Sequence, residues 1–268
     1  MPFSARGGFF KTTAGGDPLW TPAEITTNVW LDAFDGTEIT LETGVLVTSW
    51  NNKSGGTDFT QTNTGNMPDY DSTNKCVTFD GTDEWMQAAD NFVSASNPDF
   101  MCVMLADFLS LQSTSDRLFQ LEGQQAGGVI SIGHGSGGTG WNWRHNNGFS
   151  AHNSGATTGQ YMTSWVRSLN QTYSDDSTWE NGTALSRTSS ASLSNSPHIS
   201  QDFSTIGRGQ GGNENQFFYS NARIHELVML ESDDSATREK LEGYMAWRWG
   251  NEGDLPVSHP YKNAAPTV

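Results

Sequence analysis

Aromatic and polar side chains alternate over residues 141–147, which read WNWRHNN. On a strand, positions 141, 143 and 145 would share one face, and positions 142, 144 and 146 the other. Sugar rings offer C–H faces to aromatic rings, and hydroxyl edges to amide and guanidinium groups. This pattern predicts a glycan-binding strand, although a core position for both tryptophans is the simpler interpretation. The candidate residues are Trp141, Trp143, Arg144, His145 and Asn146.

Acidic pairs in turn-like segments are the candidates for a metal site. Ca²⁺ prefers carboxylate and carbonyl oxygens, which Asp80 with Asp83, or Asp175 with Asp176, can supply. Asp80-Gly81 is equally typical of a tight turn. The Asp175-Asp176 pair is most simply interpreted as exposed to solvent. The six histidines are scattered without a zinc-binding spacing. We therefore predict no cofactor and leave Ca²⁺ open.

Charge and composition exclude several partners. The chain has 268 residues, 14 basic against 30 acidic, and a net charge of −16, which repels phosphate backbones and anionic lipids. We expect neither nucleic-acid binding nor membrane insertion, since no run of about 18 apolar residues occurs. The first sixteen residues also lack the apolar stretch of a secretory signal. Ten tryptophans and 14 phenylalanines indicate a packed core rather than disorder.

Short strand-like runs separated by turn residues dominate the chain. Residues 100–108 are apolar on both faces, as in a central strand, and Asn181-Gly182 is typical of a two-residue hairpin turn. Cys76 and Cys102 lie in such runs and are expected to be buried free thiols. One helix is expected near the C-terminus, after capping residues at 232–235 and ending at Gly250. The fold class is therefore all-β, a two-sheet antiparallel jelly-roll sandwich with one short C-terminal helix.

We divide the chain into three parts. Residues 1–18 are Gly-rich and are predicted to be an extended arm that docks onto another subunit, and residues 19–250 form the sandwich. Residues 251–268, with prolines at 256, 260 and 266, form an extended tail. The arm's large anchors are Phe3, Phe9 and Phe10.

Several segments of the chain resemble laminin G-like (concanavalin A-like) domains of marine phages and bacteria. The resemblance covers roughly residues 19–262, with its ends matching best. It implies a jelly roll of two curved sheets and no single function, since such sandwiches serve as lectins, adhesion modules, enzymes and virion proteins. The matching segments are residues 19–25 (LWTPAEI), 30–33 (WLDA), 50–55 (WNNKSG), 77–81 (VTFDG), 179–182 (WENG) and 240–250 (KLEGYMAWRWG), with 255–256 (LP) and 259–261 (HPY).

The resemblance raises the question of a laminarinase-like glycoside hydrolase, which carries Glu-x-Asp-x-Glu on one strand. Residues 38–42 place Glu38 and Glu42 at the outer positions but have Thr40 where that motif has Asp. Retaining enzymes need carboxyl groups about 5–5.5 Å apart, whereas these two start about 13 Å apart on a straight strand. The sequence therefore favours a chain that is not an enzyme.

The leading prediction is a non-enzymatic virion structural protein, as a head decoration, fibre or tail component on the exposed virion surface. Its partners would be other virion proteins and further copies of itself, with a trimer weakly preferred, and host-surface glycans in addition. The first alternative is a bacterial carbohydrate-binding or adhesion module. The second is a glycoside hydrolase of the laminarinase-like type.

Overall fold

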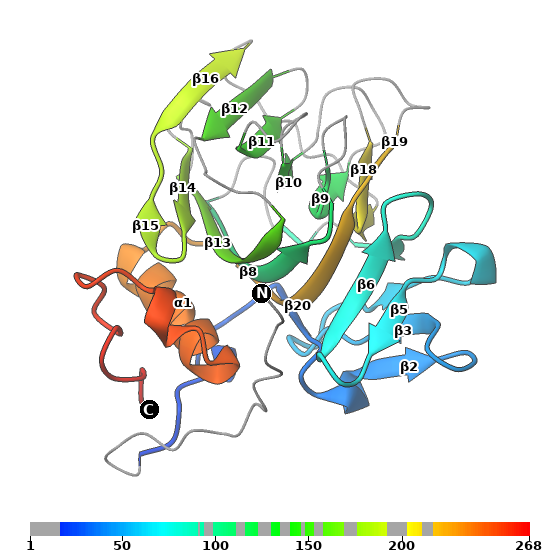
Figure 1. Cartoon of the computed structure of the whole chain (residues 1–268), viewed down its shortest axis with the longest axis horizontal. Helices are drawn as coiled ribbons and strands as arrows, with labels where there is room; N and C mark the ends of the chain where they lie inside the picture. Colours follow the sequence, from blue (N-terminus) through cyan, green and yellow to red (C-terminus); the bar gives the residue numbers. More distant parts are fainter. Residues whose placement is uncertain are drawn as a thin grey trace.

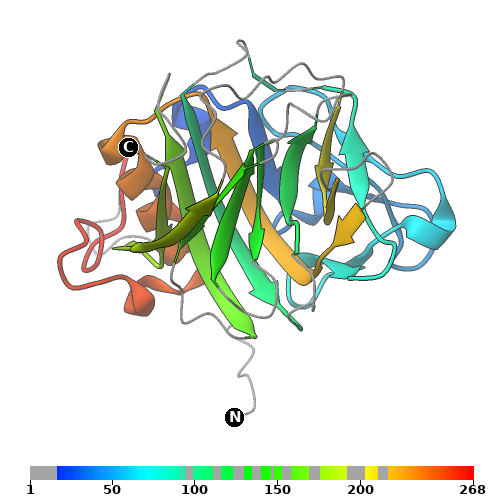
Figure 2. The same cartoon turned by 90° about the horizontal axis from the view of Figure 1, so that it is seen from above.

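The computed structural model contains two antiparallel sheets packed face to face (Figures 1 and 2). This confirms the predicted all-β sandwich. A two-stranded ribbon and one α-helix lie outside the two sheets. The structure describes residues 17–90, 92–93, 99–110, 116–122, 130–134, 140–145, 148–152, 158–168, 176–191, 203–210 and 217–268.

The first sheet has eight strands, with β8 and β20 at its centre. Both central strands carry apolar side chains on both faces because each face is covered: the other sheet packs on one side and the helix on the other. In spatial order, the strands are β15 (Thr183–Ala184), β14 (Ser177–Glu180), β13 (Gly159–Arg167), β8 (Phe100–Phe108), β20 (Asn221–Leu230), β6 (Cys76–Asp80) and β5 (Asp69–Asp71), with β1 (Val29–Asp32) also paired to β20.

The second sheet has ten strands, and its inner face closes the core. The ribbon of β18 (Arg208–Gln210) and β19 (Phe217–Tyr219) follows directly after one of its strands. In spatial order, the sheet contains β16 (Arg187–Ala191), β12 (Gly148–His152), β11 (Trp141–His145), β10 (Ile130–His134), β9 (Phe119–Glu122), β17 (Phe203–Ile206), β7 (Met86–Ala88), β4 (Phe59–Thr60), β3 (Val47–Trp50) and β2 (Ile39–Leu41).

Aromatic side chains fill the space between the sheets. Trp141 is fully buried, and its ring meets that of Trp165 edge-on at 5.6 Å and that of Phe108 at 5.3 Å. Cys76 and Cys102 are buried free thiols, as expected. Burial also raises the pKa of Cys76 to about 12, so this thiol stays protonated and unreactive.

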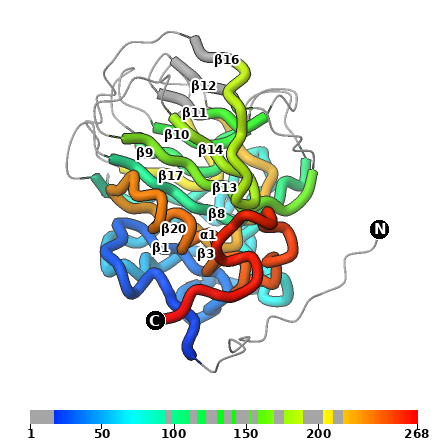
Figure 3. Tube along the Cα trace, turned by 90° about the vertical axis from the view of Figure 1, so that its left-hand side faces the viewer, coloured from blue at the N-terminus to red at the C-terminus, as the bar shows by residue number. Residues whose placement is uncertain are grey.

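Helix α1 (Ser235–Trp249) covers the outer face of the eight-stranded sheet (Figures 1 and 3). The Asp234 carboxylate accepts the Thr237 N–H at its start, and Gly250 ends it in the left-handed conformation with φ 75°. Both ends agree with the sequence prediction. Among the described residues, no helix is long and apolar enough to cross a membrane.

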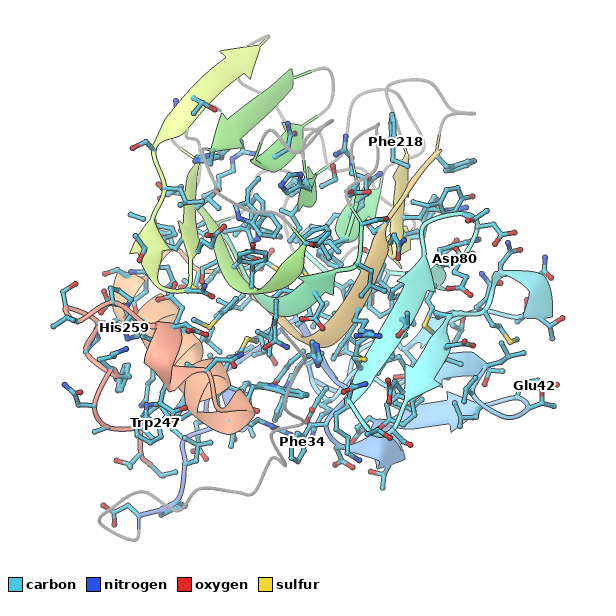
Figure 4. The ribbon with its side chains drawn as sticks, in the orientation of Figure 1. Phe34, Glu42, Asp80, Phe218, Trp247 and His259 are labelled. Carbon is cyan, nitrogen blue, oxygen red and sulfur yellow. The ribbon has the colours of Figure 1, made fainter. Side chains whose placement is uncertain are left out.

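The C-terminal residues return to the start of the described chain. Trp20 N–H donates to Pro266 O at 2.9 Å, and Leu19 forms a β-bridge with Thr267. Between helix and bridge, the tail contains the 3₁₀ helix η6 (Glu252–Asp254), and Trp247 Nε1 donates to Tyr261 O (Figure 4). Phe3, Phe9 and Phe10 lie outside the described residues, so the arm and the three-part division stay predictions.

Candidate functional site

The predicted glycan-binding run does form a strand, β11, but Trp141 points into the core. Its indole Nε1 donates to Glu180 Oε2 at 2.7 Å, while Asn142 is buried on the opposite face of the sheet. Trp141 therefore takes the structural role that the sequence left open. The backbones of Trp143, Arg144 and His145 belong to β11, and Asn146 lies outside the described residues. A binding role for these four stays a prediction.

Two of the scattered histidines flank Trp141 on neighbouring strands. His134 on β10 and His152 on β12 are each paired with Trp141 across the ladder, and both are buried. Burial lowers the pKa of His152 to about 4, so this ring is neutral at neutral pH. Within the described ranges, no three His, Cys, Asp or Glu side chains lie close enough to hold a metal ion.

The acidic candidates for Ca²⁺ have other surroundings. Asp80 Oδ1 accepts the N–H groups of Thr82 and Asp83 at 2.7 and 3.3 Å, which is turn chemistry. Asp176 is buried beside Arg167, at 3.9 Å, and not solvated as expected. Its neighbour Asp175 lies outside the described residues.

The laminarinase-like carboxylate pair does not share a strand. Glu38 closes the 3₁₀ helix η2 (Gly36–Glu38), and Glu42 lies in the turn after β2, exposed at the edge of the molecule (Figure 4). A register irregularity between Thr40 and Leu41 breaks the alternation that the motif requires. The structure therefore gives Glu38 and Glu42 no common face.

A different site lies on the outer face of the ten-stranded sheet, which the sequence analysis did not identify. Gln120 on β9 and Ser131 on β10 are direct cross-strand neighbours, and Asn142 follows on β11. Their strand neighbours Phe119, Ile132 and Trp141 belong to the core, so the three polar side chains point outward. All three are nonetheless buried, with exposed fractions of 0, 0 and 7%.

The ribbon β18–β19 covers part of this face. Gly207, with φ 83°, turns the chain out of β17, and Thr205 Oγ1 donates to the carbonyl oxygen of Arg208 at 2.9 Å. Gly209 lies so close to the sheet that a Cβ there would collide with Gln120 Oε1 and Arg117 Cγ. The ribbon's inward residue is Phe218 (labelled in Figure 4), and the Arg117 guanidinium lies over its ring, 5.2 Å from the ring centroid.

The outward face of the ribbon forms a rim with Trp85, the residue before β7. The Arg208 guanidinium stacks on the Trp85 ring, 3.4 Å from its centroid, and on the Phe217 ring at 4.3 Å. Tyr219 pairs with Arg208 across the ribbon. We call Trp85, Arg208, Phe217 and Tyr219 the aromatic rim.

The residue before Trp85 in the sequence, Glu84, carries an unusual carboxyl group. Burial raises the pKa of Glu84 to about 7, and the charge of Asp80 adds to the rise. Glu84 Oε2 accepts the Asp80 N–H at 2.8 Å. At neutral pH a substantial fraction of Glu84 is therefore protonated, which suits a proton donor.

A second polar cluster lies under helix α1, where every interaction has a structural explanation. Glu226 accepts hydrogen bonds from Trp30 Nε1, Trp249 Nε1 and the Tyr244 hydroxyl, at 2.7 to 2.9 Å. Arg248 pairs with Asp32 at 2.7 Å and lies 3.9 Å from Glu226. Burial raises the pKa of Glu226, while Arg248 opposes the rise. This cluster fastens the helix to the sheet.

Comparison with solved structures finds glycosidases with a similar fold. Trypanosoma rangeli sialidase matches with a TM-score of 0.54 and 13% identity, covering 81% of this chain and 32% of that one. Its complex with 2,3-difluorosialic acid, a covalent intermediate, matches at 0.53 and 14%, covering 88% and 35%. An arabinofuranosidase complexed with arabinofuranosyl-α-1,2-xylobiose matches at 0.53 and 12%, covering 76% and 51%.

These identities establish the fold alone, and the chain spans about a third of the length of the sialidases it matches. No family model matches the sequence, and the search of curated proteins returned no match.

The comparison contradicts the leading prediction of a non-enzymatic virion structural protein, and with it the prediction that the chain is not an enzyme. The similar structures named above are, by their titles, sialidases and an arabinofuranosidase. The acidic charge and the jelly-roll pattern that motivated the virion prediction are equally compatible with carbohydrate-active proteins, because a sandwich fold does not fix function.

The site was hidden in the sequence for a physical reason. Residues 208–210 and 217–219 are too short to stand out as strands, and the ribbon's position over β9 arises only in the folded chain. An available signal was the outward row of polar residues on otherwise apolar strands: Gln120, Ser131 and Asn142.

Proposed function

We propose that this chain is a carbohydrate-active protein that binds a glycan on the outer face of its ten-stranded sheet, at the aromatic rim. The observation that carries the proposal is the stack of Trp85, Arg208 and Phe217. Aromatic rings pack against the C–H faces of sugars, and the Phe217 ring, with 39% of its surface exposed, is available for such a contact.

The fold comparison supports a ligand of this class. The similar structures contain, by their titles, sialic acid, difluorosialic acid and an arabinofuranosyl-xylobiose. The resemblance to laminin G-like domains also supports a binding role. Glycans are therefore the partner that we propose. Self-association and cellular location stay predictions.

Hydrolysis of the bound glycan is the second candidate function, and Glu84 is the observation that favours it. A general acid must carry a proton near neutral pH, and the raised pKa of Glu84, the residue before Trp85 in the sequence, meets that condition. The glycosidase titles of the similar structures support the same idea. If it is right, Glu84→Gln abolishes release of reducing sugar while leaving binding intact.

A glycan microarray with sialylated, arabinosylated and β-glucan ligands tests the binding proposal. We expect the wild-type chain to bind at least one ligand and Trp85→Ala to lose that signal. The matched control is Trp179→Ala, because Trp179 is also half-buried and stacked on an arginine, Arg238 at 4.1 Å, but beside the helix. Absence of wild-type binding, or equal loss in both variants, would contradict the proposal.

A further inference from the structure

We infer that Gln120, Ser131 and Asn142 form a subsite for the hydroxyl groups of one sugar unit, beside and beneath the ribbon β18–β19. The inference rests on the proposed function and adds a second subsite, which contacts a part of the ligand that the aromatic rim does not reach. We call these three residues the polar floor.

The ladder of the sheet brings the polar floor together. Gln120 and Ser131 lie opposite each other on β9 and β10, which places their Cβ atoms about 5 Å apart. Asn142 is diagonal to Ser131 on β11, since Ser131 pairs with Arg144 two positions along the same face. The three side chains therefore converge within reach of one sugar ring.

Four atoms of the polar floor are buried without a hydrogen bond to any described residue. They are Gln120 Nε2, Gln120 Oε1, Ser131 Oγ and Asn142 Oδ1. Buried polar atoms in proteins almost always have partners, and each exception calls for an explanation such as a bound molecule. Four such atoms on three adjacent strands indicate a place prepared for a polar partner.

The chemistry of these atoms selects the partner. Gln120 offers one donor and one acceptor, Ser131 offers a hydroxyl that does both, and Asn142 Oδ1 accepts. Sugar hydroxyls also donate and accept, so vicinal hydroxyls on one ring complement the set. The floor residues are themselves uncharged and match hydroxyl groups, and the Arg117 side chain lies under the same ribbon, against Gly209 and Phe218.

Entry to the polar floor requires the ribbon to move, because Gly209 lies against the Gln120 amide. The closed ribbon leaves this amide buried and unpaired, a state that destabilises the closed position. Once the ribbon lifts, ligand hydroxyls supply the missing partners. The left-handed Gly207 turn, where β17 passes into the ribbon, is the point about which this movement takes place.

The test compares Gln120→Leu with wild type in two measurements, using the best ligand from the microarray as the probe. Leucine has a similar shape and no polar atoms, so we expect the variant to be at least as stable as wild type in thermal unfolding. In calorimetric titration its Kd should rise tenfold or more. Thr40→Val is the control, because Thr40 is a polar residue on the distant strand β2 of the same sheet.

The outcomes separate the inference from the proposed function. Tenfold weaker binding with unchanged or higher stability, and no effect of Thr40→Val, supports the polar floor. If wild type binds and Gln120→Leu binds equally well, the rim stands and the polar floor is no more than a hydration site. A lower melting temperature for Gln120→Leu would show that its amide is satisfied in the free protein, and absence of wild-type binding would overturn both.

Discussion

The two outer faces of the sandwich bury polar groups in opposite ways. Under helix α1, the Glu226 carboxylate receives three hydrogen bonds, and Asp32 is paired with Arg248 and Lys53. On the other side, the polar floor of the ten-stranded sheet leaves four buried atoms without a bond to described residues. A satisfied network stabilises one arrangement, whereas an unsatisfied one is ready for a further partner.

This difference distinguishes a cluster with a structural role from a candidate binding site, without reference to sequence motifs. The helix-covered face contains the more highly charged cluster, and charge alone would have made it the candidate active site. Its two carboxylates, Glu226 and Asp32, are paired within the chain, although Arg248 Nε has no hydrogen bond to a described residue. The uncharged residues under the ribbon are the better candidate because their bonds are incomplete.

The largest expected effect comes from breaking the helix-covered face. Glu226→Ala removes the acceptor for Trp30, Tyr244 and Trp249 and leaves the Arg248 charge without one of its neighbours. Removing one partner of a buried charge cluster costs about 3–5 kcal/mol, and we expect that loss in urea unfolding. Glu24→Ala, at an exposed position, is the control and should change stability by less than about 0.5 kcal/mol. A loss under about 1 kcal/mol for Glu226→Ala would show that the cluster does not hold the helix.

The next effect concerns the turn that sets the ribbon in place. Gly207→Ala combines left-handed strain with a collision against the Phe79 ring, so we expect a loss of about 2–4 kcal/mol. Gly250→Ala has the same left-handed strain, with φ 75°, but no atom within 4 Å of the new Cβ, and should cost about 1–2 kcal/mol. Equal losses in the two variants would contradict the close packing of the ribbon turn.

Lowering the pH is expected to change the free energy of unfolding in opposite directions through His152 and Glu84. The unfolded chain protonates His152 near pH 6.5, whereas the folded protein does so only near pH 4, so this residue's contribution to stability is lost as pH falls through that window. We expect a decrease of about 1–3 kcal/mol from His152. Glu84 acts in the opposite direction, because its pKa of about 7 when folded favours the folded state as pH falls from 7 towards 4.5.

The measurement is urea unfolding at a series of pH values for wild type, His152→Gln and Glu84→Gln. The histidine variant should lose less stability on acidification than wild type, and the glutamate variant should lose more. Identical pH profiles for all three proteins would contradict both pKa assignments.

The smallest effect is at the helix start. Asp234→Ala removes the side-chain acceptor for Thr237 N–H and should cost about 1 kcal/mol in unfolding, with no change in glycan binding. Asp234→Ser retains a capping oxygen and should recover most of the loss. A binding defect in Asp234→Ala would mean that the two outer faces are coupled, against the separation described above.

Local chemistry made the fold predictable from the sequence. Capping residues at 232–235 and Gly250 bracketed the helix, and Asn181-Gly182 marked a hairpin whose residues adopt φ 49° and 75°. The site depended on non-local pairing instead. Nothing near Gln120 in the sequence indicates that Ser131 lies opposite it or that Gly209 lies above it. The role of Trp141 stayed open for a related reason, because strand alternation gives two faces without saying which one meets the other sheet.

Hydrogen exchange in the presence and absence of the best microarray ligand tests the contrast between the two faces most directly. The account predicts slower exchange on binding at residues 118–122, 130–133 and 205–210, with helix α1 unchanged. Protection confined to α1 and β20, or no protection on the ten-stranded sheet at saturating ligand, would contradict it.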